Sequence, residues 1–121
     1  MFIHAKGIVA DTLNLTAHGV TVMKVEYKFN ATLRWQEVMA LRVELAKMSE
    51  QKKPDYEKIG EKVITLFGIV FGADTTKEML GFFDGCLENL VETLTPVFKV
   101  KIYPACEQAR KRAIKARKAA K

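Results

Sequence analysis

Few side chains in this sequence could perform covalent or acid–base chemistry. His4 and His18 are the two histidines, and Ser49 is the single serine. His4 lies near the N-terminus and His18 in a turn, so we expect both to be solvent-exposed and inert. The sequence contains no Ser/His/Asp set, no Gly-rich phosphate loop and no paired carboxylates on an apolar face. It therefore predicts a protein that is not an enzyme and that uses no cofactor or metal.

The two cysteines, Cys86 and Cys106, are far apart and form no metal-ligand pattern. We expect Cys86 to be a buried small hydrophobic residue, because it lies near an apolar stripe. No signal peptide is recognisable. The longest apolar stretch, residues 63–73, contains Thr65 and two glycines and is too short to span a bilayer. These features predict a cytoplasmic protein with reduced thiols and no membrane partner.

The excess positive charge is confined to the C-terminal segment, residues 104–121. This segment has seven basic residues and one acid, Glu107, whereas residues 1–103 hold 13 of each sign. The basic side chains point around the whole helix, which does not suit a membrane-surface helix, and no aromatic residue accompanies them for stacking on bases. Arg110, Lys111 and Arg112 are candidate partner-binding residues. Two interpretations stay open: a solubilising tail, or binding of nucleic acid through its phosphates.

Aromatic residues are abundant for a small domain. They include Phe67, Phe71, Phe82, Phe83 and Phe98. Four short helices cannot bury all of these rings, and the adjacent Phe82 and Phe83 cannot both point into one core. The sequence therefore predicts an exposed apolar patch that binds a partner, with Phe71, Phe82, Phe83 and the adaptable Met79 as candidate residues.

Alternating apolar and polar residues over 12–29 predict a β-hairpin that turns at His18-Gly19. The alternation changes phase at Met23-Lys24, which predicts a β-bulge there. The hairpin must pack on helices or on another chain, because two strands alone are marginally stable. Its unpaired edges and the neutral charge of residues 1–103 also predict self-association.

Helical periodicity predicts four helices after the hairpin. The first spans about 31–51 and is capped by Asn30 or Thr32. The second carries Pro54 in its first turn and ends at Gly72. A capping box of Thr75 and Glu78 begins a short third helix over 76–81, and Asp84 caps a fourth that Pro96 kinks or ends. Residues 97–103 alternate like a strand but lie between helices, so we predict helix there.

These elements define an α+β fold, mostly α, with an N-terminal β-hairpin packed on about four helices. Residues 1–103 form one globular domain, and residues 104–121 form a basic tail, helical or disordered, that nothing obliges to dock on the body. Trp35 could anchor an interface, but a core position is favoured. The predicted core contains Trp35, Leu41, Leu45, Ile59, Val63, Leu66, Phe67, Val70, Leu87, Leu90 and Leu94.

One stretch has a familiar pattern. Residues 66–76 read LFGIVFGADTT, and Leu80, Phe83, Leu87 and an acidic helix over 88–92 follow. This pattern resembles the tail assembly chaperones of long-tailed, siphovirus-type bacteriophages of Gram-positive hosts. Such proteins carry a phrase of the form F-x-x-x-F-G-x-x-T at a helix exit, then a helix of alternating acids and apolar residues, then a basic C-terminus. The phrase covers residues 66–94, and the general layout covers most of the chain.

The resemblance implies a non-enzymatic chaperone that binds the helical tape measure protein and keeps it soluble while the tail tube assembles. It also implies action in the cytoplasm of the bacterial host, absence from the mature virion, and the tail tube protein as a further partner. The alternative function is that of a small nucleic-acid-binding protein acting through the basic tail. The two functions differ in whether the apolar body or the charged tail provides the affinity.

Overall fold

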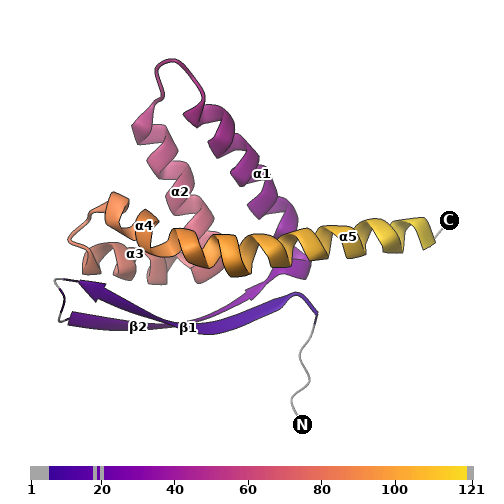
Figure 1. The fold of residues 1–121 in the computed structure, drawn as a ribbon, viewed down its shortest axis with the longest axis horizontal. Helices are drawn as coiled ribbons and strands as arrows, with labels where there is room; N and C mark the ends of the chain where they lie inside the picture. The colour runs from indigo at the N-terminus through magenta and orange to yellow at the C-terminus, as the bar shows by residue number, and fades with distance from the viewer. Residues whose placement is uncertain (1–5, 18, 20, 120–121) are drawn as a thin grey trace, which may run out of the picture.

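The computed structural model describes residues 6–17, 19 and 21–119 of the 121-residue chain. In chain order the elements are β1 (Ile8–Ala17), β2 (Thr21–Asn30), α1 (Ala31–Ser49), α2 (Tyr56–Phe71), α3 (Ala73–Phe82), α4 (Leu87–Val97), the π-helix η1 (Phe98–Ile102) and α5 (Tyr103–Ala119). Figure 1 shows the hairpin as one layer with the helices on one side of it. The α+β, mostly α fold with an N-terminal hairpin packed on helices is confirmed.

The two strands pair in antiparallel register along all ten residues of each, without interruption. The expected β-bulge at Met23-Lys24 is therefore wrong. The apolar pattern of the sequence changes phase for another reason: Val22 is an apolar residue on the solvent face, opposite Thr16, whereas Val25 lies on the buried inner face. Gly19 lies in the connecting turn with φ of +74°, a conformation that glycine adopts at little cost.

Side-chain caps fix the starts of the first two helices. Asn30 Oδ1 accepts a hydrogen bond from the Leu33 amide at 3.2 Å, which confirms the predicted cap of α1. Asp55 Oδ1 accepts from the Lys58 amide at 3.2 Å and caps α2, so Pro54 lies before the helix and not in its first turn. The two helices are antiparallel and form an arm that rises away from the sheet (Figure 1).

Gly72 forms a sharp corner between α2 and α3. It has φ of +91°, and its amide donates to the Gly68 carbonyl at 2.9 Å. Gly72 thus ends α2, as predicted, and it also precedes the first residue of α3, Ala73. The predicted capping box is wrong, because α3 begins early enough to place Thr75 and Glu78 inside it. The corner leaves no room for an intervening loop.

The elements α4, η1 and α5 follow one another without a break and form a helical rod (Figure 1). Asp84 does not cap α4: it adopts φ of +56° in the preceding turn, and Cys86 occupies the cap position. Pro96 lies within the last turn of α4. In η1 the Tyr103 amide donates to the Phe98 carbonyl, five residues back. Residues 97–103 are therefore helical, as predicted.

The π-helical turn has a local cause. Pro104 has no amide hydrogen, and in a regular α-helix its ring would clash with the carbonyl four residues earlier. A wider π turn lies immediately before Pro104, where it can relieve this clash by absorbing one extra residue. The rod therefore continues past Pro104 into α5.

The basic segment docks on the body, although its sequence has no broad apolar face that obliges it to dock. Cys106 and Ala109 of α5 are buried, and this helix packs along α1. The Arg112 Nη2 atom lies 3.4 Å from Thr32 Oγ1 at the start of α1. Because Cys106 and Ala109 are small and one turn apart, they let α5 approach α1 closely without a broad apolar stripe. The domain boundary that we expected between residues 103 and 104 falls inside the continuous rod.

The core lies between the inner face of the sheet and the helices. Leu15, Val25, Tyr27 and Phe29 contribute from the strands. Of the predicted core residues, Leu66, Phe67, Val70, Leu90 and Leu94 are buried, whereas Trp35, Leu41, Leu45, Val63 and Leu87 are half-buried and pack against the core. Ile59 is half-buried on the outer part of the arm. The arm residues are less buried than predicted because nothing in the described chain covers their outer side.

Within the described part of the chain, no helix combines the length and the apolar character that crossing a membrane requires.

Two aliphatic residues of η1 provide a test of its helical geometry. Ile102 is fully buried, whereas Val100 is 70% exposed. We predict that Ile102→Ala lowers the free energy of unfolding by about 2–5 kcal/mol, and that Val100→Ala changes it by less than about 0.5 kcal/mol. Urea titration followed by circular dichroism measures both. Equal losses would show that residues 98–102 form a strand with one buried face, not a helix.

Candidate functional site

Three of the four residues predicted to form an exposed apolar patch are buried. Phe71 is 8% exposed, Phe83 is 9% exposed and Met79 is fully buried. Only Phe82 is half-buried, and its ring packs edge-to-face on Phe83 with centroids 5.2 Å apart. The prediction of their exposure failed because the inner face of the hairpin also covers aromatic side chains: the ring of Tyr27 packs on Phe71 at 4.9 Å.

The three predicted basic site residues have different environments. Arg110 donates to the Glu107 carboxylate at 3.2 Å, and this hydrogen bond is the main reason that the pKa of Glu107 is lowered. Arg112 reaches Thr32 on α1. Lys111 is exposed to solvent. The structure therefore does not gather these three cations into one site, and two of them have protein partners.

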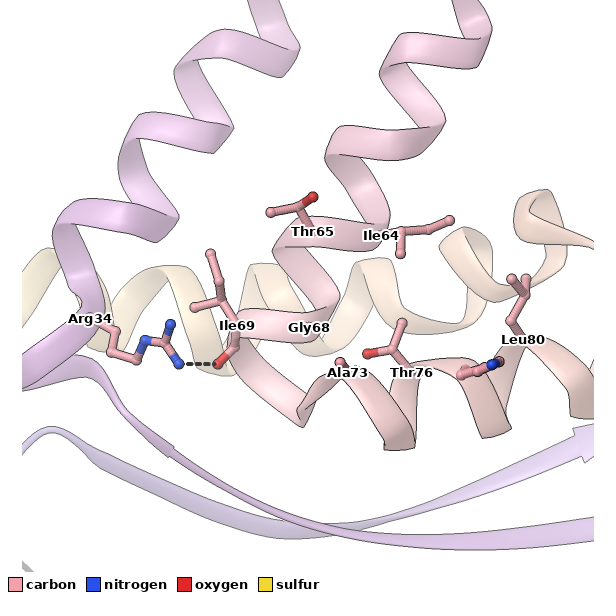
Figure 2. A pocket seen from close by; sticks show the side chains of 9 residues that line it. Arg34, Ile64, Thr65, Gly68, Ile69, Ala73, Thr76 and Leu80 are labelled. Atoms are coloured by element: carbon pink, nitrogen blue, oxygen red, sulfur yellow. Dashed lines mark hydrogen bonds between the residues drawn. The ribbon is translucent and has the colours of Figure 1, made fainter.

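An open apolar groove lies where α2 and α3 meet, and the start of α1 reaches one end of it (Figure 2). We call it the corner groove. Its volume is about 510 Å³, and its lining is mostly apolar. The residues that matter for its shape are Ile64, Gly68, Ile69, Ala73, Thr76 and Leu80. The volume lies in the range of sites that hold a small ligand or the side chains of a docked peptide.

Small residues set the depth of the corner groove. A Cβ atom added to Gly68 would lie 4.0 Å from Ala73 Cα, which is ordinary contact. Any side chain longer than a methyl group at this position would extend into the groove. The Thr76 hydroxyl donates to the Gly72 carbonyl at 2.8 Å, so the polar atom of this lining residue is already satisfied. The floor of the groove is consequently apolar.

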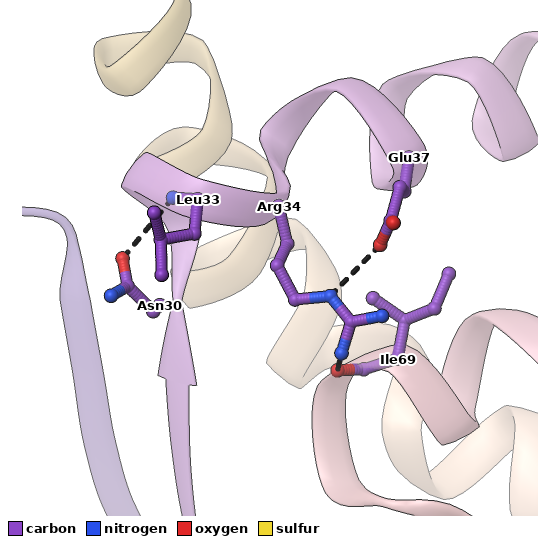
Figure 3. Close-up of polar contacts among 5 residues, drawn as sticks. All are labelled: Asn30, Leu33, Arg34, Glu37 and Ile69. Atoms are coloured by element: carbon purple, nitrogen blue, oxygen red, sulfur yellow. Dashed lines mark hydrogen bonds and ion pairs between the residues drawn. The ribbon is translucent and has the colours of Figure 1, made fainter.

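Two cations border the corner groove, Arg34 and Lys77. Figure 3 shows how Arg34 is held: its Nε donates to Glu37 at 2.8 Å and its Nη1 to the Ile69 carbonyl at 3.4 Å. The second bond satisfies a carbonyl near the C-terminal end of α2 and links α1 to the groove. Arg34 is therefore a structural support with its charge largely compensated by Glu37, whereas Lys77 is exposed on α3.

The corner groove could not be recognised from the sequence. Ile64, Ile69 and Leu80 read as members of apolar helical stripes, and such stripes are usually covered. The sharp corner at Gly72 instead holds α3 at an angle to α2, which leaves these side chains partly open; Ile64 is 39% exposed. The one feature of the sequence that pointed to this region was the LFGIVFGADTT phrase, because four residues of this phrase line the groove.

The described side chains offer little reactive chemistry. Within the described ranges, no three His, Cys, Asp or Glu side chains lie together in a way that could hold a metal ion. His4 and His18 lie outside the described residues. Cys86 is exposed, contrary to prediction, because the turn before α4 places it at the helix cap. Cys106 is fully buried against α1.

The thiols of Cys86 and Cys106 should differ sharply in reactivity. Burial raises the pKa of Cys106 from 9.0 to about 11, whereas Cys86 is accessible. The folded state retains the Cys106 proton, so stability is unaffected by this thiol below pH 9 and falls as pH rises towards 11. We predict one rapidly alkylated cysteine at pH 8, with Cys106 labelled only after unfolding, as measured by iodoacetamide and peptide mass spectrometry. Rapid labelling of Cys106 would show that α5 does not stay docked.

Comparisons of the chain with known protein families, with curated proteins and with solved structures each found no match.

Proposed function

We propose that this protein is a non-enzymatic tail assembly chaperone of a long-tailed phage, which binds the tape measure protein and keeps it soluble during tail tube assembly. It would act in the host cytoplasm, with the tail tube protein as a second partner, and would be absent from the mature virion. The resemblance of residues 66–94 supports the family, and the corner groove supports the mode of binding.

The observation that carries the proposal is the position of the groove. The phrase that resembles the chaperones contributes Gly68, Ile69, Ala73 and Thr76 to its lining, and Leu80 follows from the same resemblance. A tape measure protein presents long apolar helical stripes, and an open apolar groove is the surface that such a stripe requires. Burial of apolar area would supply the affinity, at about 25 cal/mol per Å² before the costs of ordering.

The arm carries further exposed apolar side chains outside the groove. Val43 on α1 is 52% exposed and Tyr56 on α2 is 76% exposed. Half-buried Met48 adds an adaptable side chain near the end of α1. The sheet contributes two unpaired strand edges within the described chain, which supports self-association of the chaperone along a long partner.

Co-expression with a tape measure protein from the same genome tests the proposal. We predict a soluble complex that persists at high salt, because exposed charges are screened beyond about 8 Å at physiological ionic strength while apolar burial is not weakened. Ile64→Asp and Gly68→Phe should each weaken the complex at least about tenfold at every salt concentration, since one places a charge in the groove and the other fills it.

Val100→Asp is the matched control, because it places the same charge on an exposed apolar residue outside the groove. This variant should bind like the native protein. An insoluble tape measure protein with no complex would refute the chaperone function. A complex that stays stable in both groove variants would instead show that the tape measure protein binds another face of this protein.

A second candidate function, nucleic-acid binding, is favoured by the charge of α5. Arg110, Lys111, Lys115, Arg117 and Lys118 follow Glu107 with no further acid. The end of α5 extends beyond the sheet and the arm (Figure 1). The last four of these side chains are exposed and free to approach phosphates.

Charge neutralisation separates this candidate from the first. Deleting residues 108–121 would remove the buried Ala109, so a substitution is preferable. If α5 binds nucleic acid, replacing Lys115, Arg117 and Lys118 with Gln should weaken binding to a DNA duplex and reduce the slope of log K against log salt by about 2 to 3. Lys52, Lys53 and Lys58 at the far end of the arm, replaced likewise, form the control. Equal effects of both sets, or no measurable binding, would exclude specific use of α5.

A further inference from the structure

A second cavity lies on the opposite side of α2 from the corner groove. It opens between the arm formed by α1 and α2 and the rod formed by α4, η1 and α5. We call it the interhelical cavity. Its volume is about 330 Å³, and its walls include Leu45, Val63, Phe67, Val91, Phe98 and Tyr103. The two sites share no lining residue, because Val63 and Phe67 lie on a different side of α2 from Ile64 and Gly68.

The wall of the interhelical cavity is mostly apolar and includes three aromatic rings. Phe67 and Phe98 pack with centroids 5.4 Å apart, and Phe98 packs on Tyr103 at 5.5 Å. Thr95 also lines the cavity, and its hydroxyl donates a hydrogen bond to the Val91 carbonyl at 2.6 Å. Water inside would therefore find few partners, which favours an apolar occupant.

Two cations border the same cavity, Arg42 and Lys99. The Arg42 guanidinium lies 4.2 Å from the centroid of the Tyr103 ring, so a cation–π contact holds it in place while leaving its edge open to hydrogen bonding. Lys99 is exposed on η1, where the π turn sets its direction. A planar guanidinium beside an ammonium group is a suitable environment for a carboxylate.

The interhelical cavity continues into an open hollow of about 400 Å³ that shares Arg42, Lys99 and Tyr103. The hollow contains one acid, Glu107, and this carboxylate is engaged by Arg110. The hydrogen bond from Arg110, together with the nearby charges of Lys111 and Arg42, lowers the pKa of Glu107. The mouth of the cavity therefore keeps a net positive charge, although one acid lies in it.

We propose that the interhelical cavity binds a small amphiphilic anion, with an apolar chain inside the cavity and a carboxylate between Arg42 and Lys99. The apolar aromatic wall selects the body of the ligand, and the two cations select the sign of its head group. This site is independent of the chaperone function, because it uses neither the corner groove nor the exposed end of α5.

Three probes with the same apolar chain test the head-group selection. Decanoate, decanol and decyltrimethylammonium are titrated into the full-length protein by isothermal calorimetry below their micelle concentrations. We expect decanoate to bind at least about tenfold more tightly than decanol, since its charge is hydrogen-bonded, and the cationic probe to bind most weakly. Similar affinities for all three probes would overturn the proposal, as would the absence of saturable decanoate binding.

Matched double variants locate the charge. Arg42→Gln with Lys99→Gln should remove the preference for decanoate over decanol and leave decanol binding unchanged. Arg117→Gln with Lys77→Gln makes the same change of charge at two exposed residues outside the cavity and should leave both affinities as in the native protein. An equal loss of decanoate binding in both variants would show that net charge, and not this site, attracts the anion.

Filling the cavity provides a third measurement. Val91→Phe adds bulk from α4, and Leu45→Phe adds bulk from the opposite wall on α1. Either variant, once its native circular dichroism is verified, should lose binding of decanoate and decanol together. Retained binding in a folded filled variant would overturn the proposal. If neither variant folds, the charge variants decide, because both of their cations are exposed.

Discussion

The ring of Phe98 connects the parts of this molecule. It packs on Phe67 and Phe71 of α2 and on Tyr103 at the start of α5, and Phe71 in turn packs on Tyr27 of the sheet. Phe98 is 3% exposed. A two-stranded sheet is marginally stable alone, so this contact between the hairpin, α2 and the rod is the constraint that the fold depends on. Both candidate sites lie beside α2, the element at the centre of these contacts.

Local sequence patterns predicted the type of nearly every element. Alternation identified the hairpin, and spacing of three and four residues identified the helices, because each pattern reflects one buried face. The side-chain cap at Asn30 and the end of α2 at Gly72 were predicted correctly. The starts of α3 and α4 were predicted wrongly, since the glycine corner and the turn before α4 place them without a side-chain signal.

The misassigned surface residues have a common physical cause. Phe71, Met79 and Phe83 were predicted to be exposed because four short helices cannot bury so many large side chains. The inner face of the sheet covers side chains as well, and all three residues are buried. The docking of α5 was not predicted because its contact residues are small. Cys106 and Ala109 stabilise the contact by letting the two helices pack closely, and two small residues give no apolar stripe that could be recognised in the sequence.

The π turn also determines where the charge of α5 points. An α-helix advances by about 100° per residue, so the extra residue carried by a π turn rotates everything that follows it about the helix axis. The direction of the basic side chains near the C-terminus is thus decided at Phe98–Ile102, a turn or more upstream. If the same residues formed regular α-helix, Cys106 and Ala109 would be turned away from α1. The geometry of this one turn therefore decides whether α5 can dock on α1.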